Sequence, residues 1–317
     1  MLVLTLLLGL VLLGLGGELL VRGAVGAART LGVSPLVVGL TVVGFGTSTP
    51  ELVTSLIAAF EDAPGIAIGN VVGSNIANLL LILGAGALVA PLAIARKALR
   101  REAVALAGST VVCTAVVLHG ALDAVTGAAM LVLLVAYVTW AYHSERKDTD
   151  MRRTVHQQVA DVAAPKERTL AMSLVLTGVG IGMTMLGANW LVESAIDVSR
   201  RLGVSETVIG LTVVAVGTAL PELVTTMVAA MRGHAEVALG NIIGSNVYNV
   251  LGILGVTAIL HPIGVPAEIV RLDIWVLVAA TGLITVFLAS GAKLGRIEGG
   301  ILLGGYAIYL AWLVHAA

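Results

Sequence analysis

The most constraining feature of this chain is a segment of 46 residues that occurs twice. The first copy spans 39–84, the second spans 210–255, and every position pairs at a constant offset of 171 without a gap. Of the 46 aligned pairs, 25 are identical. The identical pairs include Thr47/Thr218, Pro50/Pro221, Glu51/Glu222, Asn70/Asn241, Ser74/Ser245 and Asn78/Asn249. A bias toward Leu, Val and Ala does not repeat polar residues, so the chain contains two related halves.

The doubled segment lies in a chain that is 58% hydrophobic and only 12% charged, with a mean hydropathy of +1.03. Soluble domains average about 25% charged residues. A helix needs about 20 apolar residues to cross a bilayer, and the sequence shows none of the alternation over about ten residues that marks a membrane β-strand. We therefore expect an all-α membrane protein with spans near 1–21, 35–59, 65–91, 102–118, 122–142, 170–197, 206–230, 236–260, 270–289 and 296–315.

These ten spans divide into two sets of five. We expect a first five-helix repeat at 1–142, a polar linker at 143–169 and a second repeat at 170–317. Because five is odd, each element of the second half enters the membrane from the opposite side. Inverted repeats of this kind are typical of secondary transporters, since each half can adopt the conformation that the other holds.

The basic residues predict the orientation, because cytoplasmic loops carry an excess of Lys and Arg. With the N-terminus outside, only Arg200, Arg201 and Arg271 fall outside, and 15 of the 18 basic residues fall on the cytoplasmic side. The inside set is Arg22, Arg29, Arg96, Lys97, Arg100, Arg101, Arg146, Lys147, Arg152, Arg153, Lys166, Arg168, Arg232, Lys293 and Arg296. We expect a multi-pass protein of the cell (inner) membrane with both termini outside and the 143–169 linker in the cytoplasm.

Glu18 and Arg22 lie at the predicted cytoplasmic end of the first span. They are one helical turn apart, which allows an ion pair. Snorkelling of both side chains to the interface is the interpretation that the sequence favours.

Glu51 and Glu222 stand well inside apolar spans. An acid near the bilayer centre costs about 2.5–3.5 kcal/mol on insertion scales, and no Lys, Arg or His lies at comparable depth. A bound cation is the simplest remaining counter-charge.

The residues around these two acids offer hard oxygen ligands. Thr47 is one turn from Glu51, and Pro50, which lacks an N–H, releases the carbonyl oxygen four residues before it. Asn70, Ser74 and Asn78 share one helix face, as do Asn241, Ser245 and Asn249. Such ligands suit Ca²⁺, Na⁺ or Mg²⁺, and a dehydrated site favours Ca²⁺, because Mg²⁺ retains its waters.

Purely structural interpretations exist for each motif. Proline can simply kink a helix, and Ser or Thr can bond to the preceding turn. Gly69/Gly73 and Gly240/Gly244 have the spacing of close helix packing, which we take as their main role. Packing gives no reason, however, to bury two acids.

The motifs GTSTPE and GTALPE, each followed by GNxxGSNxxN, resemble the two α-repeats of the cation/calcium exchanger superfamily. The similarity is closest to prokaryotic sodium/calcium antiporters. The resemblance implies ten helices, with ions held among spans 2, 3, 7 and 8, and spans 1 and 6 sliding as the gate. It implies Glu51 and Glu222 as central calcium ligands, aided by Thr47 and Thr218. It also implies flanking sodium ligands at Ser48, Ser74, Ser245 and the carbonyl groups of Gly44 and Ala215, with Asn78 and Asn249 lining the middle.

Two positions depart from this family pattern. Ala219 stands where members often have Ser, and both Asn78 and Asn249 are amides where some members carry Asp. These departures leave Na⁺ and H⁺ open as the counter-ion.

We predict a secondary antiporter that exports Ca²⁺ in exchange for Na⁺ by alternating access. The alternatives are a Ca²⁺/H⁺ antiporter, since two buried neighbouring acids readily hold a proton, and a cation channel with a glutamate ring. The sequence has no P-loop pattern, no nucleophile–base set and no sign of nucleic-acid binding. We therefore expect no enzyme activity and no cofactor, with Ca²⁺, Na⁺ or H⁺ and the lipid bilayer as partners of a monomer.

Overall fold

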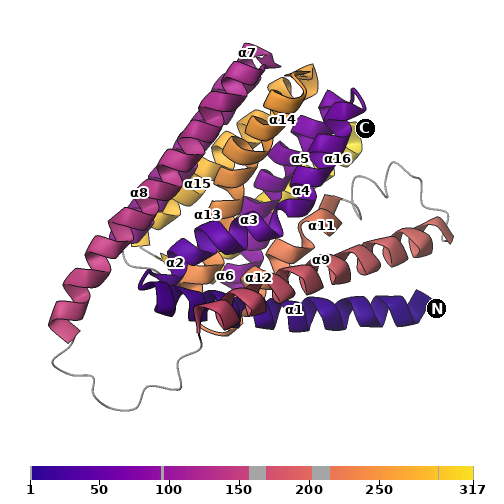
Figure 1. Cartoon of the computed structure of the whole chain (residues 1–317). Helices are drawn as coiled ribbons and strands as arrows, with labels where there is room; N and C mark the ends of the chain where they lie inside the picture. The colour runs from indigo at the N-terminus through magenta and orange to yellow at the C-terminus, as the bar shows by residue number, and fades with distance from the viewer. Residues whose placement is uncertain (1, 94–95, 157–168, 202–214, 292, 317) are drawn as a thin grey trace.

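Helices make up most of the regular structure in the computed structural model, which describes residues 2–93, 96–156, 169–201, 215–291 and 293–316 (Figure 1). The first half contains α1 (Leu2–Leu31), α2 (Pro35–Val38), η1 (Gly39–Val43), α3 (Gly44–Thr47), α4 (Thr49–Phe60), α5 (Pro64–Ile76), η2 (Ala77–Ile82), α6 (Leu83–Val89), β1 (Leu92–Ala93), α7 (Arg96–His119), β2 (Ala121–Leu122) and α8 (Ala124–His156). The symbol η denotes a π-helical segment.

The second half contains α9 (Leu170–Arg201), α11 (Ala215–Thr218), α12 (Leu220–Met231), α13 (Ala235–Tyr248), η4 (Asn249–Leu254), α14 (Gly255–Leu260), β3 (Ile263–Gly264), η5 (Ile269–Asp273), α15 (Ile274–Gly291), β4 (Lys293–Leu294) and α16 (Arg296–Ala316). Among the described residues, seven helices are long and apolar enough to cross a bilayer, and a bent pair, Pro35–Thr47 with Thr49–Phe60, adds an eighth. The remaining two predicted spans correspond to α11–α12, whose predicted start at 206 lies outside the described residues, and to α16.

The boundaries differ most from the predicted ones at two helices. The first span was expected to end at 21, but α1 continues to Leu31. The fifth was expected to end at 142, but α8 continues to His156, so the beginning of the polar 143–169 stretch is helical. Charged residues in both extensions are compatible with helix because a helix that leaves the hydrocarbon core meets water.

The doubled segment breaks its helices at equivalent points. Ser48 separates α3 from α4 with φ −84° and ψ 11°, and Ala219 separates α11 from α12 with φ −86° and ψ 3°. Across the first break the helix bends by 44°. Pro50 and Pro221 follow in the first turn of the new helix, where a missing N–H costs nothing because that N–H has no helical partner. The proline positions therefore determine where each span restarts.

Two short ladders connect the halves of the molecule. β1 pairs antiparallel with β4, and β2 pairs antiparallel with β3. These strands add to the predicted all-α architecture. β1 and β3 are equivalent at an offset of 171, yet they belong to different ladders. We call the two ends of the bundle the β1 face and the β2 face after these ladders. Equivalent connections thus lie on opposite faces, as an inverted repeat requires.

The first helices of the two halves pack along each other at backbone distance. Figure 1 shows α1 and α9 side by side and steeply inclined to α8, α14 and α15. A Cβ on Gly16 would lie 3.0 Å from the Gly180 carbonyl oxygen, and a Cβ on Gly187 would lie 2.7 Å from the Gly9 carbonyl oxygen. Glycine is required at this contact because any side chain would push the two helices apart. α1 and α9 therefore form one closely packed unit.

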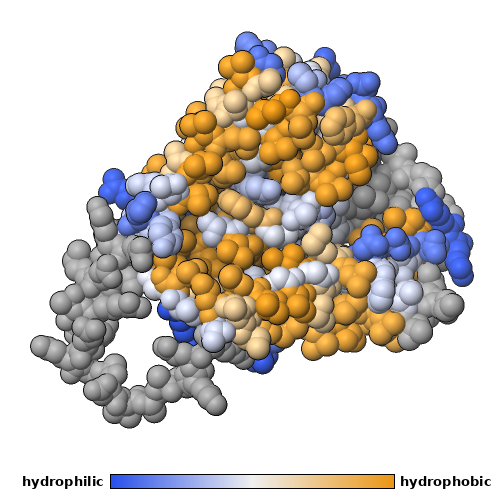
Figure 2. Space-filling view, in the orientation of Figure 1, coloured by the Kyte–Doolittle hydropathy of each residue, from blue (hydrophilic) through white to orange (hydrophobic). Residues whose placement is uncertain are grey.

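Large hydrophobic side chains cover much of the outer surface. On the face seen in Figure 2, hydrophobic residues fill most of the described area and hydrophilic ones gather toward its margins. On α7 and α8, Val111, Val125, Val132 and Val135 are each more than 60% exposed. Exposed patches of this extent are rare on soluble monomers. Lipid is the solvent that suits this surface.

Candidate functional site

The two repeated glutamates lie in the interior of the protein, one from each half. Glu51 is in the first turn of α4 and Glu222 is in the first turn of α12, and each is only 1% exposed. Helix N-termini carry partial positive charge from unpaired N–H groups. This placement stabilises a carboxylate without neutralising it.

A hydrogen bond joins the two halves at this point. The Ser48 hydroxyl, at the break before α4, donates to Glu222 Oε1 over 3.0 Å. The position equivalent to Ser48 is Ala219, which is buried and has no hydroxyl group. Glu222 therefore accepts a hydrogen bond from a hydroxyl of the first half, whereas Ala219 offers Glu51 no equivalent donor.

A second cluster of oxygens surrounds the carbonyl of Gly44. Ser245 Oγ donates to the Gly44 carbonyl oxygen over 3.2 Å, and Thr47 Oγ1 lies 3.2 Å from Asn241 Oδ1. Thr47 and Ser245 are fully buried. Three of the residues predicted as ligands, Gly44, Thr47 and Ser245, are thus adjacent although Ser245 comes from the other half of the chain.

The repeated asparagines Asn70 and Asn241 bond to the backbone of the two glutamates. Asn70 Nδ2 donates to the Glu51 carbonyl oxygen over 2.9 Å, and Asn241 Nδ2 donates to that of Glu222 over 3.3 Å. The same amides contact the hydroxyl groups of Ser55 and Thr226. Sequence reasoning missed Ser55 and Thr226, although a hydroxyl repeated at the 171 offset was available as a signal.

Four buried acceptor atoms of the repeated acids and central amides have no hydrogen-bond partner. They are Glu51 Oε2, Glu222 Oε2, Asn78 Oδ1 and Asn249 Oδ1, two from each half. α4 packs against η4, which starts at Asn249, and α12 packs against η2, which contains Asn78. A buried acceptor without a partner costs several kcal/mol, and buried polar groups in native proteins are almost always satisfied. A bound cation would satisfy these four acceptors, so they mark a candidate cation site.

All candidate ligand atoms at this site are oxygens. It contains carboxylates, amides, hydroxyls and carbonyls, and among the described residues no three His, Cys, Asp or Glu side chains gather in one cluster. Oxygen ligands with few charges suit Ca²⁺ and Na⁺, whereas Zn²⁺ prefers nitrogen and sulfur. The side chains gathered here therefore have the chemistry of a hard-cation site.

The remaining predicted residues lie close to this set. Ser74 is buried one turn before Asn78, Thr218 is the last residue of α11, and Ala215 is its first. Thr218 lines a cavity of about 370 Å³ together with Pro50, Pro221 and Asn189. The cavity lies between α9 and the two proline-containing turns, on the side of the site toward the β2 face. Its lining includes Thr218, one of the predicted ligands.

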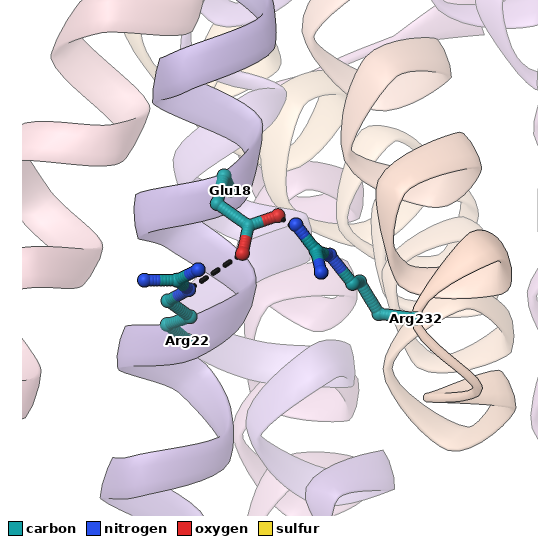
Figure 3. Close-up of polar contacts among 3 residues, drawn as sticks. All are labelled: Glu18, Arg22 and Arg232. Carbon is teal, nitrogen blue, oxygen red and sulfur yellow. Dashed lines mark hydrogen bonds and ion pairs between the residues drawn. The ribbon is translucent and has the colours of Figure 1, made fainter.

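On the opposite side α1 closes against α12. A Cβ on Gly17 would lie 2.9 Å from a methyl group of Val224. Next to it, Glu18 lies between two arginines (Figure 3): Arg22 Nε is 2.5 Å from Glu18 Oε1 and Arg232 Nε is 2.9 Å from Glu18 Oε2. The pairing of Glu18 and Arg22, which the sequence ranked below snorkelling, is formed. We refer to Glu18, Arg22 and Arg232 as the ion triad.

Known proteins match this chain along nearly its whole length. The family model described as "Sodium/calcium exchanger protein" matches residues 1–143 and 172–315. The sodium/calcium exchanger MaX1 of Methanosarcina acetivorans is 34% identical over 98% of each chain, and the inner membrane protein YrbG of Escherichia coli is 33% identical over 97% of this chain and 95% of its own. A structure of the sodium-calcium exchanger NCX_Mj superposes with a TM-score of 0.84 at 33% identity, covering 98% of each chain. The predicted architecture of ten helices in two inverted repeats is confirmed by this match.

Proposed function

This chain belongs to the sodium/calcium exchanger family, and from that premise we propose that it exports Ca²⁺ in exchange for Na⁺ by alternating access. It is a multi-pass membrane antiporter and not an enzyme. The main support for Ca²⁺ and Na⁺ as the exchanged ions is a set of four buried acceptor atoms without a hydrogen-bond partner: Glu51 Oε2, Glu222 Oε2, Asn78 Oδ1 and Asn249 Oδ1.

The charge of the site explains how the two ions are coupled. Glu51 and Glu222 carry two negative charges in a medium where unpaired charge is expensive. One Ca²⁺ or two Na⁺ neutralises them, and both ions use the same oxygens. Binding of one ion therefore excludes the other. A protein with an empty site carries two uncompensated carboxylates, so its change between the two end states of transport has the highest energetic cost.

We assign the ligands as follows. Glu51, Glu222, Thr47 and Thr218 bind Ca²⁺, while Asn78 and Asn249 line the middle of the site. Ser48, Ser74, Ser245 and the carbonyls of Gly44 and Ala215 form the flanking Na⁺ sites. Support comes from the contacts among Gly44, Thr47 and Ser245 and from the Ser48–Glu222 hydrogen bond. Both carboxylates come from one chain, so a monomer carries a complete site.

The conformation favours access from one face. The cavity beside Thr218 lies toward the β2 face, while α1 is packed on α12 toward the β1 face. We assign the β1 face to the cytoplasm, since the predicted inside segments carry most of the Lys and Arg. We assign the protein to the inner membrane, as the name of YrbG states for that relative. Sliding of the α1–α9 unit across the core then opens the other face.

Flux through liposomes tests the proposed exchange. Purified protein is reconstituted, the vesicles are loaded with Na⁺, and uptake of radioactive Ca²⁺ is measured after dilution into Na⁺-free buffer. We expect uptake that stops when K⁺ replaces internal Na⁺. Uptake driven by a pH gradient without Na⁺ would establish the proton version instead, and unitary currents in a planar bilayer would identify a channel.

Substitution of Ala219 by Ser examines the asymmetry around the glutamates. A Ser at this break is equivalent to Ser48, so its hydroxyl is expected to reach Glu51 as Ser48 reaches Glu222. The added oxygen should strengthen Na⁺ binding and lower the Na⁺ concentration for half-maximal Ca²⁺ exchange. Ser48→Ala is the converse change, since it removes the existing hydroxyl, and it should raise that concentration. An unchanged Na⁺ dependence in both variants would remove these positions from the sodium sites.

A further inference from the structure

Another identical pair of the doubled segment, Asn75 and Asn246, lies outside the assigned ligand set. Both side chains are amides, and they are 2% and 1% exposed. Asn75 is in the last turn of α5 and Asn246 is in α13. Asn75 Nδ2 donates to the backbone carbonyl oxygen of Asn246 over 3.1 Å. The two equivalent residues therefore touch, which places them where the two halves meet.

Asn75 also contacts a residue of the ion site. Asn249 Nδ2 donates to Asn75 Oδ1 over 3.0 Å. An amide has its donor nitrogen and its acceptor oxygen on opposite sides of one carbon. When the NH₂ group of Asn249 is held by Asn75, its Oδ1 must point the other way, and this oxygen is one of the four unpartnered acceptors.

The equivalent contact in the other half is not made. Asn246 Nδ2 donates instead to the Ile242 carbonyl oxygen of its own helix over 2.7 Å, and Asn246 Oδ1 has no hydrogen-bond partner. Asn78, the equivalent of Asn249, is therefore not held by Asn246. The repeated sequence has produced two different arrangements, and only Asn75 bonds to a central amide.

We propose that Asn75 is a positioning residue that fixes the amide of Asn249 with its oxygen toward the bound Ca²⁺. The chain of contacts runs from the Asn246 carbonyl oxygen through both ends of the Asn75 amide to Asn249. The Asn246 carbonyl sets the orientation of Asn75, because only an NH₂ group donates to it. Asn75 then presents an acceptor to Asn249. The proposal rests on the proposed function, since it concerns the same cation.

This arrangement also accounts for the amide at position 249. A carboxylate there would place an acceptor against Asn75 Oδ1, with no proton between them. An amide supplies the proton and keeps the site at two negative charges, the number that one Ca²⁺ neutralises. Asn75 and Asn249 thus form one unit, and the amide at 249, where some family members carry Asp, is a side chain that Asn75 can orient.

The test compares Asn75→Ala with Asn246→Ala. Loss of Asn75 frees the Asn249 amide to turn its NH₂ group toward the cation. Removing a group that orients a metal ligand typically lowers affinity about 10–100-fold, so we expect Asn75→Ala to raise the Ca²⁺ concentration for half-maximal uptake about 10-fold or more, with the maximal rate largely retained. Asn246→Ala keeps the backbone carbonyl that Asn75 bonds to; it removes a bond within α13 and an oxygen that bonds to no other group, so it should leave this concentration unchanged. Equal shifts in both variants would overturn the proposal.

A second background separates orientation from general packing. In Asn249→Asp there is no amide to orient, and Asn75 Oδ1 faces a second acceptor oxygen, so adding Asn75→Ala should cause no further loss of Ca²⁺ affinity. An additive loss in the double variant would contradict the proposal. Calorimetric titration of the detergent-purified proteins with Ca²⁺ completes the test. If the unaltered protein binds no Ca²⁺, the proposed function fails; if it binds and Asn75→Ala binds equally well, only the role of Asn75 fails.

Discussion

Replacing either Glu51 or Glu222 by Gln is expected to abolish Ca²⁺ transport while the protein still folds. Gln has nearly the same shape as Glu, so packing in the first turn of α4 or α12 is retained, but the site then carries one negative charge. Removing one partner of a buried charge pair costs about 3–5 kcal/mol, which corresponds to about 100-fold or more in affinity. Ca²⁺ uptake by reconstituted vesicles is the measurement.

The control for this change is available next to the same helix. Glu61 follows α4 and is exposed, so Glu61→Gln changes the chain's charge equally without touching the site. We expect Glu61→Gln to transport normally and all three variants to elute as single peaks in detergent. Near-normal uptake by Glu51→Gln or Glu222→Gln would show that the assigned carboxylate does not bind the ion.

Gly180→Leu is expected to separate α1 from α9 and to remove most of the transport activity. A Cβ at Gly180 would lie 2.7 Å from the Gly16 carbonyl oxygen and would also meet the Leu20 backbone nitrogen. Because both contacts are backbone atoms, no side-chain rotation relieves them. Overpacking of this kind costs about 1–3 kcal/mol or more. The thermal unfolding temperature in detergent and the Ca²⁺ flux should both fall.

Gly182→Leu provides the comparison, because a Cβ at Gly182 meets nothing within 4 Å. Leu has a higher helix propensity than Gly, so this variant should be as stable as the unaltered protein or slightly more so. If Gly180→Leu were as stable and active as Gly182→Leu, the close contact between α1 and α9 would have no role in the gate.

Much of this site could be anticipated because its residues are repeated. Glu51 and Glu222 could be identified as site residues because burying an acid is costly and no basic residue lies at their depth. The prolines predicted released backbone carbonyls, and the helices break two residues before them, at Ser48 and Ala219. These conclusions follow from local sequence, which both copies state independently.

Contacts between the halves could not be predicted in this way. The sequence does not show that Ser48 reaches Glu222 or that Arg232 reaches Glu18, because the two residues of these pairs are 174 and 214 positions apart in the chain. The direction of an amide is likewise invisible in sequence: Asn75 and Asn246 are identical in letter, yet their hydrogen bonds differ. The two-residue strands were missed because such short pairings have no recognisable pattern.

The ion triad has a consequence for the balance between the two end states. The positions equivalent to Glu18, Arg22 and Arg232 are Asn189, Glu193 and Glu61, and there the Asn189 amide simply donates to Glu193 over 3.0 Å. Two identical halves would give the end states equal energies. Here Glu18 attracts Arg22 and Arg232 when α1 is packed against α12. The equivalent positions hold an amide and two acids, which provide no such attraction. A partly exposed pair contributes up to about 1 kcal/mol, so an empty carrier rests several times more often with its β1 face shut and waits for its next ion from the opposite compartment.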